Sequence, residues 1–214
     1  MRKAIYIHGL GGSGNGSSAT NVRNFLKGRY ELSANTYDLL QPEEAFAQIK
    51  NDVEGFDLII ASSLGAFYAS ALDKKIPTIL LNPCLEPKSA IPPLLYPEQK
   101  AMFNQEKCFK EWDKISLLRE KLSEESRVET VSGDEDFRTV KVGIFADNDE
   151  YFSFKEKFIS LFGTENEEEM SRNRDTFGGN KNCFGIHGTH EIAKHPEMLK
   201  DALEKAFTYI NACQ

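Results

Sequence analysis

The fold is decided by the stretch Leu58-Ile59-Ile60-Ala61-Ser62-Ser63-Leu64-Gly65, an apolar run that changes abruptly to small residues. A short run rich in isoleucine predicts a buried strand, and residues 64–69 favour a helix. The sequence therefore predicts a strand, a sharp turn and a helix. A serine in such a turn is either an exposed nucleophile or the N-cap of the helix.

The spacing of the small residues distinguishes the two serines of this turn. In the nucleophile-elbow pattern Gly-x-Ser-x-Gly, Ala61 takes the place of the first glycine and Gly65 that of the second. The pattern then selects Ser63, and not Ser62, as the exposed hydroxyl. Five residues with one substitution are a weak pattern, so the N-cap interpretation stays open until the rest of the chain is considered.

Length and charge bound the class of protein. A chain of 214 residues buries roughly 70% of its unfolded surface on folding, which predicts a single domain over residues 1–214. The formal net charge is −7, and no basic stripe is present that could neutralise the phosphates of a nucleic acid. We therefore expect no nucleic acid among the partners.

Cysteine spacing and hydropathy indicate the compartment. The apolar stretch that follows Met1-Arg2-Lys3 is too short for a signal peptide, and no run of 18 or more apolar residues follows. The sequence thus predicts a soluble cytoplasmic protein with no membrane span. No Cys-x-x-Cys pair forms a metal or redox site, and we expect four reduced, buried thiols at Cys84, Cys108, Cys183 and Cys213.

A glycine-rich loop follows the first predicted strand, residues 4–7, and precedes a predicted helix over residues 17–26. Its sequence is His8-Gly9-Leu10-Gly11-Gly12-Ser13-Gly14-Asn15-Gly16. One mechanism for such a loop is phosphate binding. Residues 11–18 match Gly-x-x-x-x-Gly-Lys-Ser/Thr except at the lysine, which is Ser17, so only amide dipoles remain to meet a phosphate.

The second mechanism for this loop is an oxyanion hole of the His-Gly-x-x type. In such a loop, a backbone N–H after an early strand donates to a developing alkoxide, and here the donor is the Leu10 amide. Unlike the phosphate-binding pattern, this pattern requires no lysine, so Ser17 does not count against it. Its supporting residues are His8, Gly9, Gly11 and Gly12.

Strands alternate with helices along the rest of the chain. The apolar pattern predicts strands at residues 33–39, 77–81, 140–146 and 182–186, and helices at residues 42–53, 154–162 and 196–209. Because no tight hairpins join the strands, we expect an α/β fold with a mainly parallel sheet and helices on both faces. Residues 85–138, with clustered prolines, predict a helical, lid-like insertion whose aromatic residues are equally well explained as helix core.

Candidate acid and base residues follow the last two predicted strands. Asp147 and Asp149 lie at the strand end where parallel α/β sheets bind ligands, and His187 and His190 follow the final strand. With Ser63, they give the chain order serine, aspartate, histidine that is expected of an α/β-hydrolase.

The chain resembles the α/β-hydrolase superfamily, and most closely its small YqiA-like esterase family, from Lys3 to the C-terminal helix. The resemblance implies a three-layer α/β-hydrolase sandwich that hydrolyses a small-molecule acyl ester without a cofactor or metal. Two departures are Ala61 in the elbow and the long insertion. The residues that carry the resemblance are Tyr6-Ile7-His8-Gly9, Ala61-Ser62-Ser63-Leu64-Gly65, Leu81-Asn82-Pro83, Asp149 and Gly188-Thr189-His190.

The resemblance also implies a role for each site residue. Ser63 attacks the acyl carbonyl to form an acyl-enzyme, His190 acts as the base and then the acid, and Asp149 orients the imidazole. The amides of Leu10 and Leu64 form the oxyanion hole.

Within this family pattern, Asp149 is preferred to Asp147 because the acid follows a small strand-end residue by three positions. His190 is preferred to His187 because the triad histidine lies in the loop after the last strand, here behind Gly188.

Two other functions remain as alternatives. The first is a nucleotide-binding protein that uses residues 11–18, with Asp147 holding a metal ion. The second is a catalytically silent hydrolase fold that binds a partner through the insertion.

Overall fold

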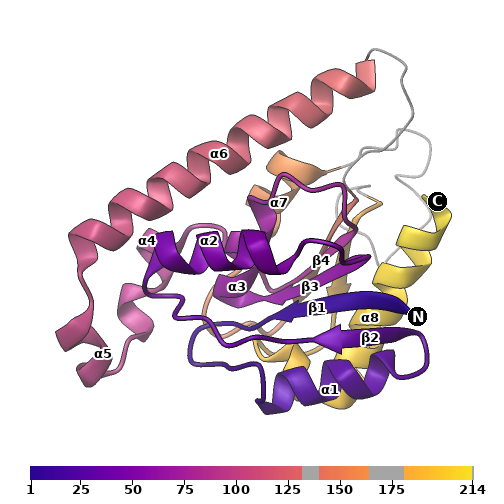
Figure 1. Ribbon diagram of the computed structural model, residues 1–214, viewed down its shortest axis with the longest axis horizontal. Helices are drawn as coiled ribbons and strands as arrows, with labels where there is room; N and C mark the ends of the chain where they lie inside the picture. The colour runs from indigo at the N-terminus through magenta and orange to yellow at the C-terminus, as the bar shows by residue number, and fades with distance from the viewer. Residues whose placement is uncertain (132–139, 164–180, 214) are drawn as a thin grey trace.

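The computed structural model describes residues 1–131, 140–163 and 181–213. Its centre is a sheet of six parallel strands in the order β2-β1-β3-β4-β5-β6 (Figure 1), which confirms the predicted parallel α/β architecture. The strands are β1 (Arg2–Ile7), β2 (Tyr30–Ser33), β3 (Leu58–Ser62), β4 (Thr78–Leu81), β5 (Lys141–Ala146) and β6 (Cys183–Ile186).

Helices pack on both faces of this sheet and form two cores (Figure 1). On one face, α1 (Ser17–Leu26) and α8 (Pro196–Ala212) form the α1–α8 core. On the other, the α3–α6 core contains α2 (Pro42–Asp52), α3 (Ser63–Ser70), α6 (Gln105–Val131) and α7 (Lys155–Phe162). The shorter helices are α4 (Pro87–Ala90), η1 (Pro92–Leu94), α5 (Pro97–Met102) and η2 (Ile192–Lys194).

Side chains of the central strands alternate between the two cores. In β3, Leu58 and Ile60 pack in the α1–α8 core, whereas Ile59 and Ala61 pack in the α3–α6 core. Burial on both faces explains why the run is apolar at every position and does not alternate with polar residues. By the same alternation, Ser62 at the end of β3 belongs to the α1–α8 side.

The strand order places a crevice between the ends of β1 and β3. The chain leaves β1 to form α1 on one face, and it leaves β3 to form α3 on the other, so the two connections diverge. Parallel α/β sheets bind ligands at such a switch point, outside the carboxyl ends of the strands. The glycine-rich loop, residues 8–16, and Ser63 follow these two strand ends.

The predicted strand at residues 33–39 is wrong. The strand in this region is β2, and its ladder with β1 ends at Ser33. Beyond that point the chain runs beside the glycine-rich loop, where the Tyr37 amide donates to Nε2 of His8 at 3.0 Å. Contacts with a loop therefore replace the strand partner that residues 34–39 would need.

Helices α4, α5 and α6 lie between β4 and β5, in the predicted insertion, of which residues 132–138 are outside the described chain. Two buried side chains fasten α6 to the α3–α6 core: Nε1 of Trp112 donates to the Tyr68 hydroxyl at 3.0 Å, and Arg119 donates to the Leu85 carbonyl at 2.8 Å. Part of the insertion thus belongs to the core, and its action as a lid stays a prediction.

The expectation of buried thiols holds for three of the four cysteines. Cys84, Cys108 and Cys183 are buried, and burial raises the pKa of the Cys183 thiol to about 12. The expectation is wrong for Cys213, which is exposed because it lies beyond Ile210, the last buried residue of α8.

A Gly65→Ala substitution tests how closely α3 must approach β1. A Cβ atom at Gly65 would lie 2.1 Å from the His8 carbonyl oxygen and 2.8 Å from that of Ile7, and neither backbone atom can move cheaply. We expect urea unfolding to show a loss of about 3 kcal/mol. Gly16→Ala is the matched control, because its Cβ meets nothing closer than 3.4 Å. Equal losses in the two variants would contradict this packing.

Candidate active site

Ser63 has a left-handed backbone at the turn from β3 to α3. Its φ is +51°, a conformation that is rare for a residue with a side chain and costs about 1 to 3 kcal/mol. A hydrogen bond of 3.1 Å from the Cys84 amide to the Ser63 carbonyl holds the turn. This geometry is that of a nucleophile elbow, in which the serine hydroxyl stands out from the end of the strand.

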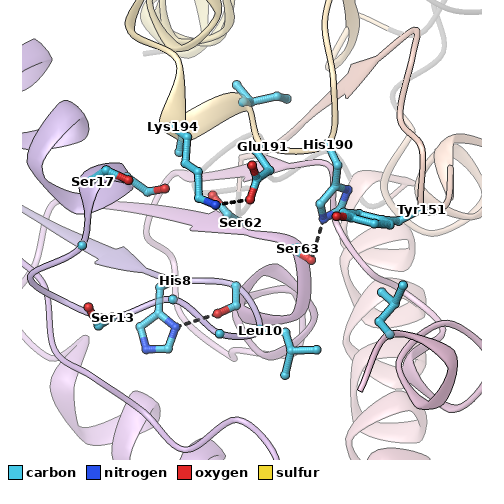
Figure 2. A pocket seen from close by; sticks show the side chains of 18 of the residues that line it. His8, Leu10, Ser13, Ser17, Ser62, Ser63, Tyr151, His190, Glu191 and Lys194 are labelled. Carbon is cyan, nitrogen blue, oxygen red and sulfur yellow. Dashed lines mark hydrogen bonds and ion pairs between the residues drawn. The ribbon is translucent and has the colours of Figure 1, made fainter. Parts of the chain in front are cut away.

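Ser63, His190 and Asp149 are joined by two hydrogen bonds. Nε2 of His190 lies 2.9 Å from Oγ of Ser63 (Figure 2). Nδ1 of His190 lies 2.7 Å from Oδ2 of Asp149. The side chains of His190 and Asp149 are only 9% and 3% exposed. The arrangement can take a proton from a serine hydroxyl and hold the resulting imidazolium against a carboxylate that is shielded from water.

Both Asp149 and His190 are fixed by their surroundings. The second oxygen of Asp149 accepts hydrogen bonds from the amides of Tyr151 at 2.9 Å and Phe152 at 3.1 Å. The rings of Tyr151 and Phe152 lie edge-on to the imidazole of His190, with centroids 4.9 Å and 4.8 Å away. Neither side chain can therefore rotate freely.

Asp147 and His187 form a separate pair at the surface. Their side chains are 54% and 87% exposed, and Oδ2 of Asp147 lies 2.9 Å from Nδ1 of His187. The hydrogen bond from His187 and one from the Gly188 amide lower the pKa of Asp147, and Asp147 in turn raises the pKa of His187. This pair fastens the loop after β6 but does not contact Ser63 through any hydrogen bond of the described residues.

Asn82, at the end of β4, connects the turns that carry Asp149 and His190. Its side-chain amide donates to the carbonyls of Thr189 at 3.2 Å and His190 at 3.0 Å, and its Oδ1 accepts from the Ala146 amide at 2.8 Å. Asn82 is buried and has a φ of +41°. The sequence indicates Asn82 only as part of the stretch Leu81-Asn82-Pro83, because the hydrogen-bond partners of its side chain are distant in the chain.

His8 holds the glycine-rich loop in place. Its Nδ1–H donates to the Gly9 carbonyl at 2.8 Å, and its Nε2 accepts from the Tyr37 amide, so the neutral imidazole is the form that fits. Burial lowers the pKa of His8. The loop then passes close to the nucleophile turn, since a Cβ at Gly9 would lie 2.9 Å from Cβ of Ser63.

The predicted oxyanion donors lie on either side of Ser63. Leu64 is the second residue of α3, and the first amides of a helix have no acceptor within it. Leu10 follows Gly9 in the loop and lines the cavity next to Ser63. Two backbone amides from different strand ends are thus available near one hydroxyl.

A cavity of about 400 Å³ opens beside Ser63 and His190 (Figure 2). The predicted residues His8, Gly9, Leu10, Gly11 and Gly12 line it. Ser17 and Ser18, from the loop proposed for the nucleotide-binding alternative, also line it. Further lining residues come from the insertion and η2, and no sequence motif indicates them: Ile91, Leu94, Tyr96 and Lys194. In the described ranges, no cluster of His, Cys, Asp and Glu could hold a metal ion.

The chain is similar in fold to solved structures that include an alpha/beta hydrolase domain-containing protein. Alpha/beta hydrolase domain-containing protein 10 from mouse aligns with a TM-score of 0.59 and 14% identity, over 99% of this chain and 90% of that one. Est1E from Butyrivibrio proteoclasticus, with ferulic acid bound, aligns with a TM-score of 0.56 and 16% identity, over 100% of this chain and 90% of that one. The fold is therefore that of the α/β-hydrolase class.

The sequence itself identifies the family. Residues 3–136 match the family model described as Uncharacterised protein family (UPF0227), and the chain belongs to this family. The resemblance to the α/β hydrolases and their YqiA-like family is thereby confirmed. A comparison with curated protein sequences finds no match. Among the described helices, none is both long and apolar enough to cross a membrane.

The buried neutral His8 predicts a pH dependence of stability. Folding lowers the pKa of His8 below its ordinary value of 6.5. At a pH between the folded and the unfolded pKa, the unfolded chain therefore binds more protons than the folded chain. We expect the free energy of unfolding to fall as the pH drops below 6.5, and His8→Asn to flatten this dependence in urea titrations.

His187→Asn is the matched control for His8→Asn. The pKa of His187 is raised, so the removal of His187 cannot flatten a loss of stability on acidification. A pH dependence that is the same with and without His8 would contradict the role given to its neutral imidazole.

Proposed function

We propose that this chain is a serine hydrolase, a carboxylesterase that cleaves a small acyl ester through an acyl-enzyme intermediate. The observation that carries the proposal is the continuous hydrogen-bonded series from Asp149 through His190 to Ser63, in which Asp149 is buried and both His190 and Ser63 line a cavity. Its chemistry needs no group beyond the side chains and amides of the chain itself.

In the first half of the reaction, Oγ of Ser63 attacks the carbonyl carbon of the ester while its proton passes to Nε2 of His190. The carbonyl electrons move to oxygen, and the amides of Leu10 and Leu64 donate to that oxyanion. When the oxyanion collapses, the bond to the alcohol oxygen breaks, and His190 returns the proton to that oxygen. The alcohol leaves, and the acyl group remains on Ser63.

In the second half, water replaces the alcohol. Nε2 of His190 takes a proton from the water as the water oxygen attacks the acyl carbon, and the tetrahedral species collapses to a carboxylic acid. The proton returns to Oγ of Ser63. Throughout, Asp149 accepts a hydrogen bond from Nδ1–H of His190 and stabilises the imidazolium without becoming protonated itself.

A nucleotide-binding function has less support. Ser17 occupies the position of the phosphate-binding lysine, so the loop lacks its charge. In this alternative Asp147 would hold a metal ion, but both of its carboxylate oxygens accept hydrogen bonds, Oδ2 from His187 and Oδ1 from the Gly188 amide. A silent hydrolase fold is also less well supported, because a role in partner binding would not require hydrogen bonds that align Ser63 with His190.

Ser63→Ala tests the nucleophile. Hydrolysis of short-chain p-nitrophenyl esters should fall by about a millionfold, to the residual rate, because the attacking oxygen is lost. Ser89→Ala is the matched control: Ser89 is an exposed serine of α4 whose hydroxyl donates to the Glu86 carbonyl at 3.0 Å, and its loss should leave turnover unchanged. Hydrolysis by Ser63→Ala at the wild-type rate would refute the proposal.

Asp149→Asn and Asp147→Asn together test the acid. The amide at position 149 favours the wrong tautomer of His190, and we expect turnover to fall by about 10⁴-fold. The surface pair of Asp147 contributes little, so Asp147→Asn should stay within about threefold of wild type. Steady-state kinetics on the same esters measure both, and a larger loss at position 147 would move the acid to Asp147.

A further inference from the structure

The cavity beside Ser63 has two walls of different chemistry, one from each side of the sheet. The apolar wall consists of Leu10, Ile91, Leu94 and Tyr96. Ile91 is buried in the α3–α6 core, and Leu10 packs against that core. The wall therefore continues the apolar packing of that layer up to the nucleophile, and it presents no charged side chain.

The polar wall lies on the opposite side and consists of Ser17, Ser18, Ser62 and Lys194. In Figure 2, Ser17 and Lys194 lie together on one side of the site, away from Leu10. These residues come from α1, the end of β3 and η2, next to the α1–α8 core.

Hydrogen bonds hold the polar wall as a fixed surface. The Asn21 side chain of α1 donates to the carbonyls of Ala193 at 3.1 Å and Lys194 at 2.9 Å, which joins α1 to η2. The buried Tyr6 hydroxyl donates to Oγ of Ser62 at 3.0 Å. The ammonium group of Lys194 is paired with Glu191, so the wall combines hydroxyl groups with a neutralised charge.

The position of His190 relates these walls to the two halves of an ester. The alcohol oxygen must lie within hydrogen-bond reach of Nε2 of His190 to receive its proton. The chain continues from His190 directly into Glu191 and η2, which border the polar wall. The alcohol half is therefore directed to the polar wall, and the acyl half to the apolar wall.

We propose that the substrate joins an apolar acyl group to a neutral alcohol that carries further hydroxyl groups. Serine hydroxyls both donate and accept, so they match the hydroxyls of such an alcohol, and the paired Lys194 leaves no net charge to favour an anion. This inference rests on the proposed esterase function, and it names the substrate class of the same site.

Glycerol monobutanoate and propyl butanoate test the alcohol half, because they share an acyl group and a three-carbon alcohol but differ by two hydroxyls. We expect kcat/KM to be at least about tenfold higher for the glycerol ester. The double substitution Ser17→Ala with Ser18→Ala should bring this ratio close to one. Thr20→Ala, an exposed residue of α1 outside the cavity, should retain it.

Glycerol monobutanoate and glycerol monoacetate test the acyl half. Leu94→Ala should lower the ratio of kcat/KM for the butanoyl ester to that for the acetyl ester about tenfold, and it should leave the preference for the glycerol ester over the propyl ester intact. Leu117→Ala, at an exposed position of α6, is the control and should change neither ratio. Because only the acyl group remains after the alcohol leaves, Leu94→Ala should also alter the rate of deacylation, and the serine substitutions should not.

Two results would overturn the inference. One is equal or better hydrolysis of propyl butanoate by the wild-type protein. The other is an exchange of effects, in which the serine substitutions change acyl preference and Leu94→Ala changes alcohol preference. In both cases hydrolysis that still depends on Ser63 would leave the esterase proposal standing. Absence of hydrolysis with every ester would instead refute the proposed function and the inference together.

Discussion

The left-handed backbone of Ser63 is the constraint on which the rest of the site depends. A φ of +51° is unfavourable for serine, and it persists because the surrounding structure leaves no alternative. α3 starts at Ser63, and its remaining residues, from Leu64 onward, are all buried. Gly65 lets this helix approach the carbonyls at the end of β1 more closely than any side chain would permit. Packing free energy from the core thus offsets strain in the turn, and the Ser63 hydroxyl is held where it meets His190.

Strand order then brings His190 and Asp149 to that hydroxyl. β4 lies between β3 and β5, so its end is adjacent both to the elbow and to the strand that leads to Asp149. Asn82 occupies that end, and its one side chain contacts the carbonyl of His190 and the amide of Ala146. Since every polar atom of this buried amide has a partner, a shift of either turn would leave one unsatisfied. The switch point of the sheet also explains the two-sided cavity, because the connections after β1 and β3 depart to opposite faces.

Local patterns in the sequence were sufficient to predict the α/β class, the strand-to-helix turn at Ser63 and the glycine-rich loop. These patterns are informative because the backbone geometry of a sharp turn requires small residues at fixed positions. Gly65, where α3 approaches the end of β1, is one of them. The apolar pattern of residues 33–39 predicts a strand, but strand formation depends on pairing, and the ladder between β1 and β2 ends at Ile5 and Ser33. The contacts of Asn82 join segments far apart in the chain, and Ile91 and Ser63, also far apart in the chain, line one cavity; no local periodicity indicates either arrangement.

A covalent probe tests whether the turn after β3 exposes one activated serine. A fluorophosphonate reacts with an activated hydroxyl, forming an oxygen–phosphorus bond with loss of fluoride, and peptide mass spectrometry then locates the adduct. We predict stoichiometric modification of Ser63 in the folded protein and none at Ser62, whose hydroxyl is bonded to Tyr6. An adduct on Ser62, or a folded protein that does not react at all, would contradict the account.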